Sequence, residues 1–266
     1  MKVGDRVWTI DGATTRDMSL MQARRRLSGG DGSEELLQIF RGAERKRQEF
    51  RLKRNIPQHS PFEARVETGG IGYLRLRNPA RAGRDSLAVA LTDLERRGAR
   101  KLLLDLRGAT RGGMDDALRI AGLFIGEQTV VRSVERGGLE VEHHGKGPAL
   151  CKLPTWVLVN RGTAGASEIL AAALRDRFNA KLLGEKTCGF GARQEMIRLP
   201  AGDGLVLSVA RYLSPAGSGW HGEGLKENVA IPLSAPDKGA DPEEKQLRRA
   251  LELVAAEGAA AAAKAA

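Results

Sequence analysis

The stretch Gly162-Thr163-Ala164-Gly165-Ala166-Ser167-Glu168-Ile169-Leu170 decides the fold. It follows the run Thr155–Asn160, whose apolar residues are nearly continuous, as is typical of a strand covered on both faces. From about Ala164 to Arg177 the apolar residues recur with helical spacing. A buried strand, a turn rich in small residues and a helix, in this order, predict one unit of a layered α/β domain.

Apolar strand patterns and helical patterns alternate on both sides of this unit. They predict strands over Gly72–Leu76, Lys101–Leu106 and Lys181–Leu183, and helices over Asp85–Arg97, Met114–Phe124 and Pro242–Glu257. Shorter alternation predicts antiparallel strands over Val130–Glu135, Leu139–His143, Glu195–Leu199 and Leu205–Tyr212. The expected fold class is therefore α/β, with a layered mixed β-sheet core flanked by helices.

Three further motifs follow a fixed order with the first. They are Leu104-Asp105-Leu106-Arg107 with Gly112-Gly113, then Gly184-Glu185-Lys186-Thr187-Cys188-Gly189-Phe190-Gly191, then Ala210-Arg211-Tyr212-Leu213-Ser214-Pro215 with His221-Gly222-Glu223-Gly224-Leu225. Together these motifs resemble those of the C-terminal processing peptidases, also called tail-specific proteases, from Gly4 to Leu253. The resemblance implies a crotonase-like protease core, a PDZ domain and the chemistry of a serine endopeptidase with a Ser/Lys dyad.

At the two catalytic positions this chain departs from the family pattern. The family's nucleophilic serine falls on Gly165, which has no side chain, and its general-base lysine falls on Phe190, which has no lone pair. Gln194 falls on the glutamine that supports the lysine in the family. The oxyanion donors that the resemblance implies are the backbone N–H groups of Ala166, Gly112 and Gly113. We therefore expect a proteolytically inactive family member, a pseudoenzyme whose groove still binds polypeptide.

A displaced active site is the main alternative. Ser167 and Lys186 lie close in sequence to the two altered positions, and an active serine-type endopeptidase would use them as its dyad. A plainer interpretation of Ser167 is a hydroxyl in the first turn of a helix that bonds a free N–H. A plainer interpretation of Lys186 is a solvated lysine on a loop. Cys188 with His221 as its base is a further pair, although nothing in its spacing is diagnostic. A third possibility is a scaffold subunit that pairs with an active paralogue.

The first 54 residues predict a smaller α+β module. Arg6–Ile10 alternates polar and apolar residues before the turn Asp11-Gly12, and Ser19-x-x-Gln22 is a capping box that opens a helix. Strand patterns over Leu36–Arg41 and Gln48–Lys53 follow. This order resembles the second half of a permuted PDZ domain. The front half, with the loop that holds a peptide carboxylate, is absent from the sequence.

The expected domain organisation follows from these patterns. It comprises a partial PDZ-like domain at 1–54, a linker at 55–61, a protease-like α/β domain at 62–257 and an Ala-rich tail without expected order at 258–266. The start at Met1 has no apolar segment typical of a signal peptide, whereas members of the family are usually exported. The compartment is therefore left open.

Composition argues against several other classes of partner. The net charge of +10 comes mainly from scattered arginines, and 4% aromatic residues without a nucleic-acid-binding motif give no reason to expect nucleic acid. No apolar run is long enough to predict a membrane span. Cys151 and Cys188 lack metal or redox spacing, and the residues of His143-His144 point to opposite faces of a strand, so no metal or cofactor is expected. Whether the two cysteines pair is left open.

Overall fold

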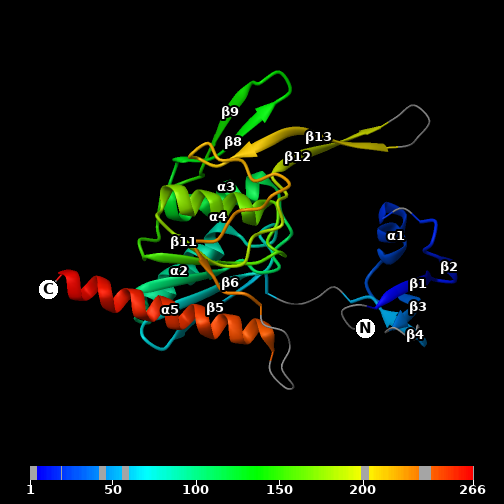
Figure 1. Ribbon diagram of the computed structural model, residues 1–266, viewed down its shortest axis with the longest axis horizontal. Helices are drawn as coiled ribbons and strands as arrows, with labels where there is room; N and C mark the ends of the chain where they lie inside the picture. The colour runs from blue at the N-terminus through cyan, green and yellow to red at the C-terminus, as the bar shows by residue number, and fades with distance from the viewer. Residues whose placement is uncertain are drawn as a thin grey trace. The chain divides into compact units, whose positions relative to one another are not determined.

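The computed structural model describes residues 5–18, 20–41, 46–55, 60–198, 204–233 and 241–265. The chain divides into two compact units, residues 1–59 and 60–266, whose elements are drawn in Figure 1. Both units combine strands with helices, and the mixed α/β class expected from the sequence is confirmed. The capping residue Ser19 and residues 56–59 of the expected linker lie outside the described residues.

The first unit is a four-stranded antiparallel sheet with one helix. Its elements are β1 (Arg6–Ile10), β2 (Ala13–Thr14), α1 (Leu20–Leu27), β3 (Glu34–Arg41) and β4 (Lys46–Lys53), with the strand order β2-β1-β3-β4. Arg54 ties the helix to the sheet, because its guanidinium lies 2.5 Å from the buried Glu35 carboxylate and also donates to the last carbonyls of α1. One cation thereby pairs with one oxygen of a buried carboxylate and caps a helix C-terminus.

A six-stranded sheet forms the centre of the second unit. It consists of β5 (Phe62–Glu67), β6 (Ile71–Leu76), β7 (Lys101–Asp105), β10 (Thr155–Val159), β11 (Lys181–Gly184) and β14 (Val229–Ala230), in the order β14-β11-β10-β7-β6-β5. All pairings are parallel except that of β5 with β6. The loops that leave the carboxyl ends of β7, β10 and β11 therefore emerge at one edge of the sheet, where α/β folds place their sites.

Helices cover both faces of this sheet (Figure 1). Leu102 and Leu104 of β7 pack on one face with α2 (Arg84–Arg96), α3 (Met114–Ile125) and α4 (Ala166–Arg177), while Leu103 packs on the other face with α5 (Pro242–Ala265). The continuous apolar strands of the sequence are explained by this burial on both sides. Helix α5 extends to Ala265, in keeping with the high helix propensity of alanine.

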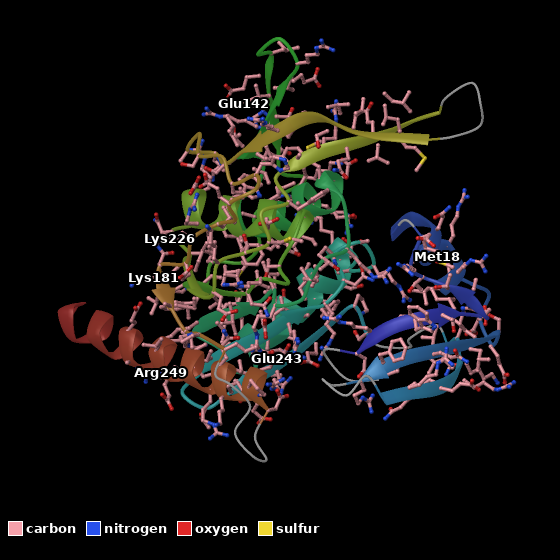
Figure 2. The ribbon with its side chains drawn as sticks, turned by 45° about the vertical axis from the view of Figure 1, so that its right-hand side comes forward. Met18, Glu142, Lys181, Lys226, Glu243 and Arg249 are labelled. Carbon is pink, nitrogen blue, oxygen red and sulfur yellow. The ribbon has the colours of Figure 1, made fainter. Side chains whose placement is uncertain are left out.

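A second antiparallel sheet lies beside α3 and α4. It consists of β8 (Thr129–Glu135), β9 (Glu140–His144), β12 (Ala192–Arg198) and β13 (Gly204–Leu213), in the order β12-β13-β8-β9. These are the four strands that the sequence predicted from short alternation. Glu142 of β9, labelled in Figure 2, accepts a hydrogen bond of 2.9 Å from Thr129, which secures the outer strand β9 to β8.

A buried polar cluster fastens α5 to the carboxyl end of β7. The Asp105 carboxylate is 0% exposed and accepts hydrogen bonds from the Tyr73 hydroxyl at 2.8 Å and from Arg107 at 2.7 Å. Arg107 also donates to the carbonyl of Glu243, a residue labelled in Figure 2, and to the Gln246 side chain. The ion pair therefore joins the sheet to the first turns of α5 just before the loop that leads to Gly112 and Gly113.

Replacing Asp105 with alanine should lower the free energy of unfolding by about 3–5 kcal/mol, because Arg107 would keep a buried charge without its partner. Urea denaturation followed by circular dichroism measures this loss. Arg249→Ala is the matched control, since Arg249 forms an exposed ion pair with Glu252 and its removal should cost about 1 kcal/mol or less. Equal stability of the two variants would contradict a structural role for the buried pair.

Candidate active-site cleft

An open cavity of about 500 Å³ lies where the amino-terminal ends of α3 and α4 meet β12 and β13. The lining residues are Gly112, Gly113, Met114, Asp115, Asp116, Gly165, Ala166, Ile169, Phe190, Ala192, Arg193, Gln194 and Tyr212. Six of them come from the sequence predictions, namely Gly165, Phe190, Gln194, Ala166, Gly112 and Gly113. The fold thus brings together these six residues, which lie up to 82 positions apart in the chain, from Gly112 to Gln194.

Gly165 and Phe190 face each other in this cavity. A Cβ atom built on Gly165 would lie 3.6 Å from Cδ1 of Phe190, which is ordinary van der Waals contact. Gly165 is the residue that precedes the first turn of α4, and its φ of 60° and ψ of −117° are unfavourable for any residue with a side chain. The two positions that the resemblance pairs as nucleophile and base are therefore neighbours in space, and both carry unreactive residues.

The Glu168 carboxylate holds the loops that carry these two residues. Its side chain is 0% exposed, and Oε2 accepts hydrogen bonds from the N–H groups of Gly165 at 3.1 Å and Phe190 at 2.8 Å. Its Oε1 accepts from the Gly189 N–H at 2.7 Å and from the Thr187 hydroxyl at 2.5 Å. Backbone donors and the amino-terminal end of α4 thus compensate the buried negative charge.

Two further hydrogen bonds complete the connection between the loops. The Thr187 hydroxyl accepts a bond of 2.7 Å from the N–H of Leu225, which attaches the following loop. The N–H of Cys188 donates to the carbonyl of Thr163 at 3.0 Å. Residues 187–190 are therefore fixed to the turn that precedes α4 and to the first turn of this helix, through the Glu168 carboxylate and the Thr163 carbonyl.

The oxyanion positions are only partly as the sequence predicted. The Gly113 N–H is already engaged, because it donates to Oδ2 of Asp116 at 2.9 Å. Among the described residues, no acceptor is recorded for the N–H groups of Ala166 and Gly112. The loop before Gly112 is anchored by a bond of 3.1 Å from the Ala164 N–H to the Ala109 carbonyl. Within the described residues, two of the three expected donors thus have no acceptor.

The candidates for a displaced site do not line the cavity. Ser167 is buried in α4 with 0% exposure, and its hydroxyl has no hydrogen-bond partner within the described residues, so the first-turn bond that we expected is absent. Lys186 is exposed on its loop. Cys188 and His221 are also exposed and lie outside the lining. The geometry therefore places no Ser/Lys or Cys/His pair in this cleft.

The lining of the cavity lacks the serine or cysteine nucleophile and the amine or imidazole base of the candidate dyads. It contains no serine, threonine, cysteine, lysine or histidine, and its one hydroxyl belongs to Tyr212. Burial raises the pKa of Tyr212 and so disfavours ionisation of its hydroxyl. The sequence predictions missed Tyr212, Met114 and Ile169 as lining residues. The motif that contains Tyr212 and the helical spacing of Ile169 after Gly165 were the signals that could have indicated them.

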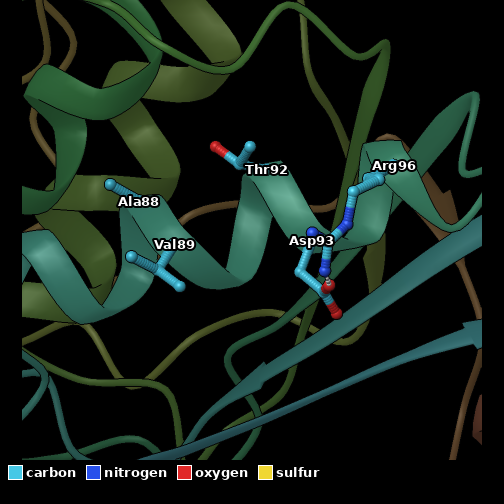
Figure 3. A pocket seen from close by; sticks show the side chains of 5 residues that line it. All are labelled: Ala88, Val89, Thr92, Asp93 and Arg96. Atoms are coloured by element: carbon cyan, nitrogen blue, oxygen red, sulfur yellow. Dashed lines mark hydrogen bonds and ion pairs between the residues drawn. The ribbon is translucent and has the colours of Figure 1, made fainter.

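A second depression, of about 350 Å³, lies along the outer face of α2 (Figure 3). Its lining is Ala88, Val89, Thr92, Asp93 and Arg96, and the last two form an ion pair of 2.7 Å. In the part of the chain that is described, no group of three or more His, Cys, Asp or Glu residues could hold a metal ion. No helix there is long and apolar enough to cross a membrane.

A known protein family matches most of the second unit. Residues 70–231 match the family described as Peptidase family S41. The chain belongs to this peptidase family. The matched residues include the central sheet except β5, the loops joined by Glu168 and every residue that lines the cleft.

Related proteins carry names of the group that the sequence resembled. The chain is 36% identical to the carboxyl-terminal-processing protease of Synechocystis sp., with 94% of this chain and 60% of that protein covered. It is 31% identical to the carboxy-terminal processing protease CtpA of Bacillus subtilis, with 88% and 50% covered. The chain thus spans between half and six-tenths of the length of these two relatives.

A solved structure shows the same fold. The photosystem II D1 C-terminal processing protease superposes with a TM-score of 0.72 and 28% sequence identity, over 91% of this chain and 64% of that one. The resemblance to C-terminal processing peptidases that the motifs indicated is confirmed at the level of family and fold.

Substitution of Glu168 by alanine should destabilise the S41 domain by about 3 kcal/mol or more, since it would leave several buried donors without an acceptor. Urea denaturation measures the loss, and amide hydrogen exchange at Gly189 and Phe190 should accelerate. Asp85→Ala is the control. Asp85 is an exposed carboxylate in the first turn of α2, and its removal should lower the free energy of unfolding by about 1 kcal/mol or less. A loss in Glu168→Ala no larger than in this control would refute the structural role of the carboxylate.

The two cysteines should differ in reactivity towards Ellman's reagent at pH 8. Both are free thiols; Cys188 is exposed, whereas burial raises the pKa of Cys151 to about 11 and keeps it protonated. We expect one thiol to react in the folded protein and two after unfolding in guanidinium. Finding no thiol in unreduced, unfolded protein would show instead that the cysteines are paired.

Proposed function

We propose that this chain is a non-hydrolysing member of peptidase family S41 that binds extended polypeptide in the cleft. The contact between Gly165 and Phe190 supports this proposal above all, since a Cβ on the glycine would touch the phenylalanine ring at 3.6 Å. The positions that resemble the family's nucleophile and base are neighbours, so the altered pair is not explained by a shifted loop. Membership of the family suggests polypeptide as the ligand.

Acyl transfer needs a nucleophile, a base and donors for the oxyanion. The cleft offers only the donors, through the N–H groups of Ala166 and Gly112. Loss of the nucleophile or the base of such a unit lowers turnover by about 10⁶-fold, and loss of both costs little more because they act together. Hydrolysis by the family mechanism is therefore expected to be undetectable.

The features required for binding are retained. A volume of about 500 Å³ falls within the range of about 300–1,000 Å³ that is usual for ligand sites. The walls include the apolar side chains of Met114, Ile169 and Phe190, and the two N–H groups can fix a backbone carbonyl of the ligand. We further infer that residues 1–54 form a partial PDZ-like module, on the basis of their strand and helix order.

Restoring both catalytic side chains tests the proposal. The wild-type chain should neither cleave casein nor react with a fluorophosphonate, whereas the double variant Gly165→Ser/Phe190→Lys should do both. Neither single variant should gain activity, because the serine and the lysine work only as a pair. A serine at position 165 meets no steric obstacle, but its φ of 60° should cost about 1–3 kcal/mol of stability, which thermal denaturation measures.

Two outcomes would contradict the proposal. Turnover or fluorophosphonate labelling of the wild-type chain that disappears in Ser167→Ala would establish a displaced active site. Turnover that survives this substitution would reveal another mechanism. The control for the preparation is Ser86→Ala, which removes an exposed hydroxyl on α2 and should change neither readout.

A further inference from the structure

Phe190 presents an aromatic surface to the cleft rather than filling its core. The residue is 40% exposed, and its ring lies against the space above Gly165. Its backbone is fixed by the hydrogen bond of 2.8 Å from its N–H to Glu168. The backbone at position 190 is therefore fixed, and the exposed ring lines the cleft beside Gly165, where a bound segment can contact it.

The charged side chains that line the cleft are already paired within the chain. The pairs are Asp115 with Lys146 at 2.9 Å, Asp116 with Arg119 at 2.6 Å and Arg193 with Glu135 at 3.1 Å. A charged side chain of a ligand would have to enter without a free opposite charge to receive it, at a desolvation cost. The cleft therefore favours uncharged ligand side chains.

The remaining walls suit an aromatic group. Phe190 and Tyr212 contribute rings, and Met114 contributes a flexible thioether that packs well against aromatic rings. Gly165 has no side chain between these walls and the N–H of Ala166. The space beside Gly165 is thus bounded by the Phe190 ring and by backbone atoms.

We propose that Phe190 is a specificity-determining residue, which packs against an aromatic side chain of the bound polypeptide. This inference rests on the proposed polypeptide binding. The preferred ligand is an extended segment with a neutral, aromatic residue at the cleft. Its free carboxyl group is not required, because Arg193, the one cation in the lining, forms ion pairs with Glu135 and Glu195.

Fluorescence anisotropy with labelled ten-residue peptides tests this preference. The peptides are Gly/Ser-based, blocked at both ends, and carry one central Phe, Leu, Asp or Lys. The Phe peptide should bind about tenfold more tightly than the Asp and Lys peptides and a few-fold more tightly than the Leu peptide. A Phe peptide with a free carboxyl end should bind as well as the blocked one.

Variants separate a direct contact from a general effect on the fold. Phe190→Ala should weaken binding of the Phe peptide about tenfold, whereas Phe190→Leu should retain the Leu peptide and remove the aromatic preference. Val89→Ala, which removes an apolar side chain that is 70% exposed on α2, should leave all affinities unchanged. Unchanged melting temperatures should accompany these results, because position 190 keeps its backbone hydrogen bond.

The outcomes distinguish this inference from the proposed function. Equal binding of all four peptides, or a Phe190→Ala variant that binds the Phe peptide as the wild type does, would overturn the role of Phe190 and leave polypeptide binding intact. Absence of binding by every peptide would overturn both. A strict requirement for the free carboxyl end would also overturn the preference for an internal aromatic residue.

Discussion

One buried carboxylate organises the cleft. Glu168 accepts four hydrogen bonds from Gly165, Thr187, Gly189 and Phe190, so the turn before α4 and the loop after β11 share a single acceptor group. Burial of this charge is tolerable because backbone dipoles surround it. Every other feature of the site depends on this arrangement, including the contact of Phe190 with Gly165 and the course of the loop that joins Leu225. The framework is made of backbone donors and one acid, and neither a serine nor a lysine contributes to it.

The framework of the fold is separate from the two positions that resemble the family's dyad. The sheet, the helices on both its faces and the clasp of Asp105 with Arg107 involve no residue that would react with a substrate. Substitution at positions 165 and 190 therefore leaves the packing intact. At position 165 it even removes strain, since glycine adopts a φ of 60° more readily than any other residue.

The sequence predicted the fold well because the central strands are buried on both faces and the helices have clear apolar stripes. It also indicated the positions that meet in the cleft, since ordered motifs fixed the register of Gly165 and Phe190. Two features depended on three-dimensional detail that no linear pattern carries. The Asp116 side chain folds back onto the Gly113 N–H, and the Ser167 hydroxyl has no hydrogen-bond partner in the interior.

The left-handed backbone at Gly165 has an evolutionary consequence. A change of Gly165 to serine would lose conformational stability at once, while the family's Ser/Lys pair would also need a change at position 190. Selection acting near a stability threshold would discard the single variant. The backbone of this turn therefore opposes a stepwise gain of the pair.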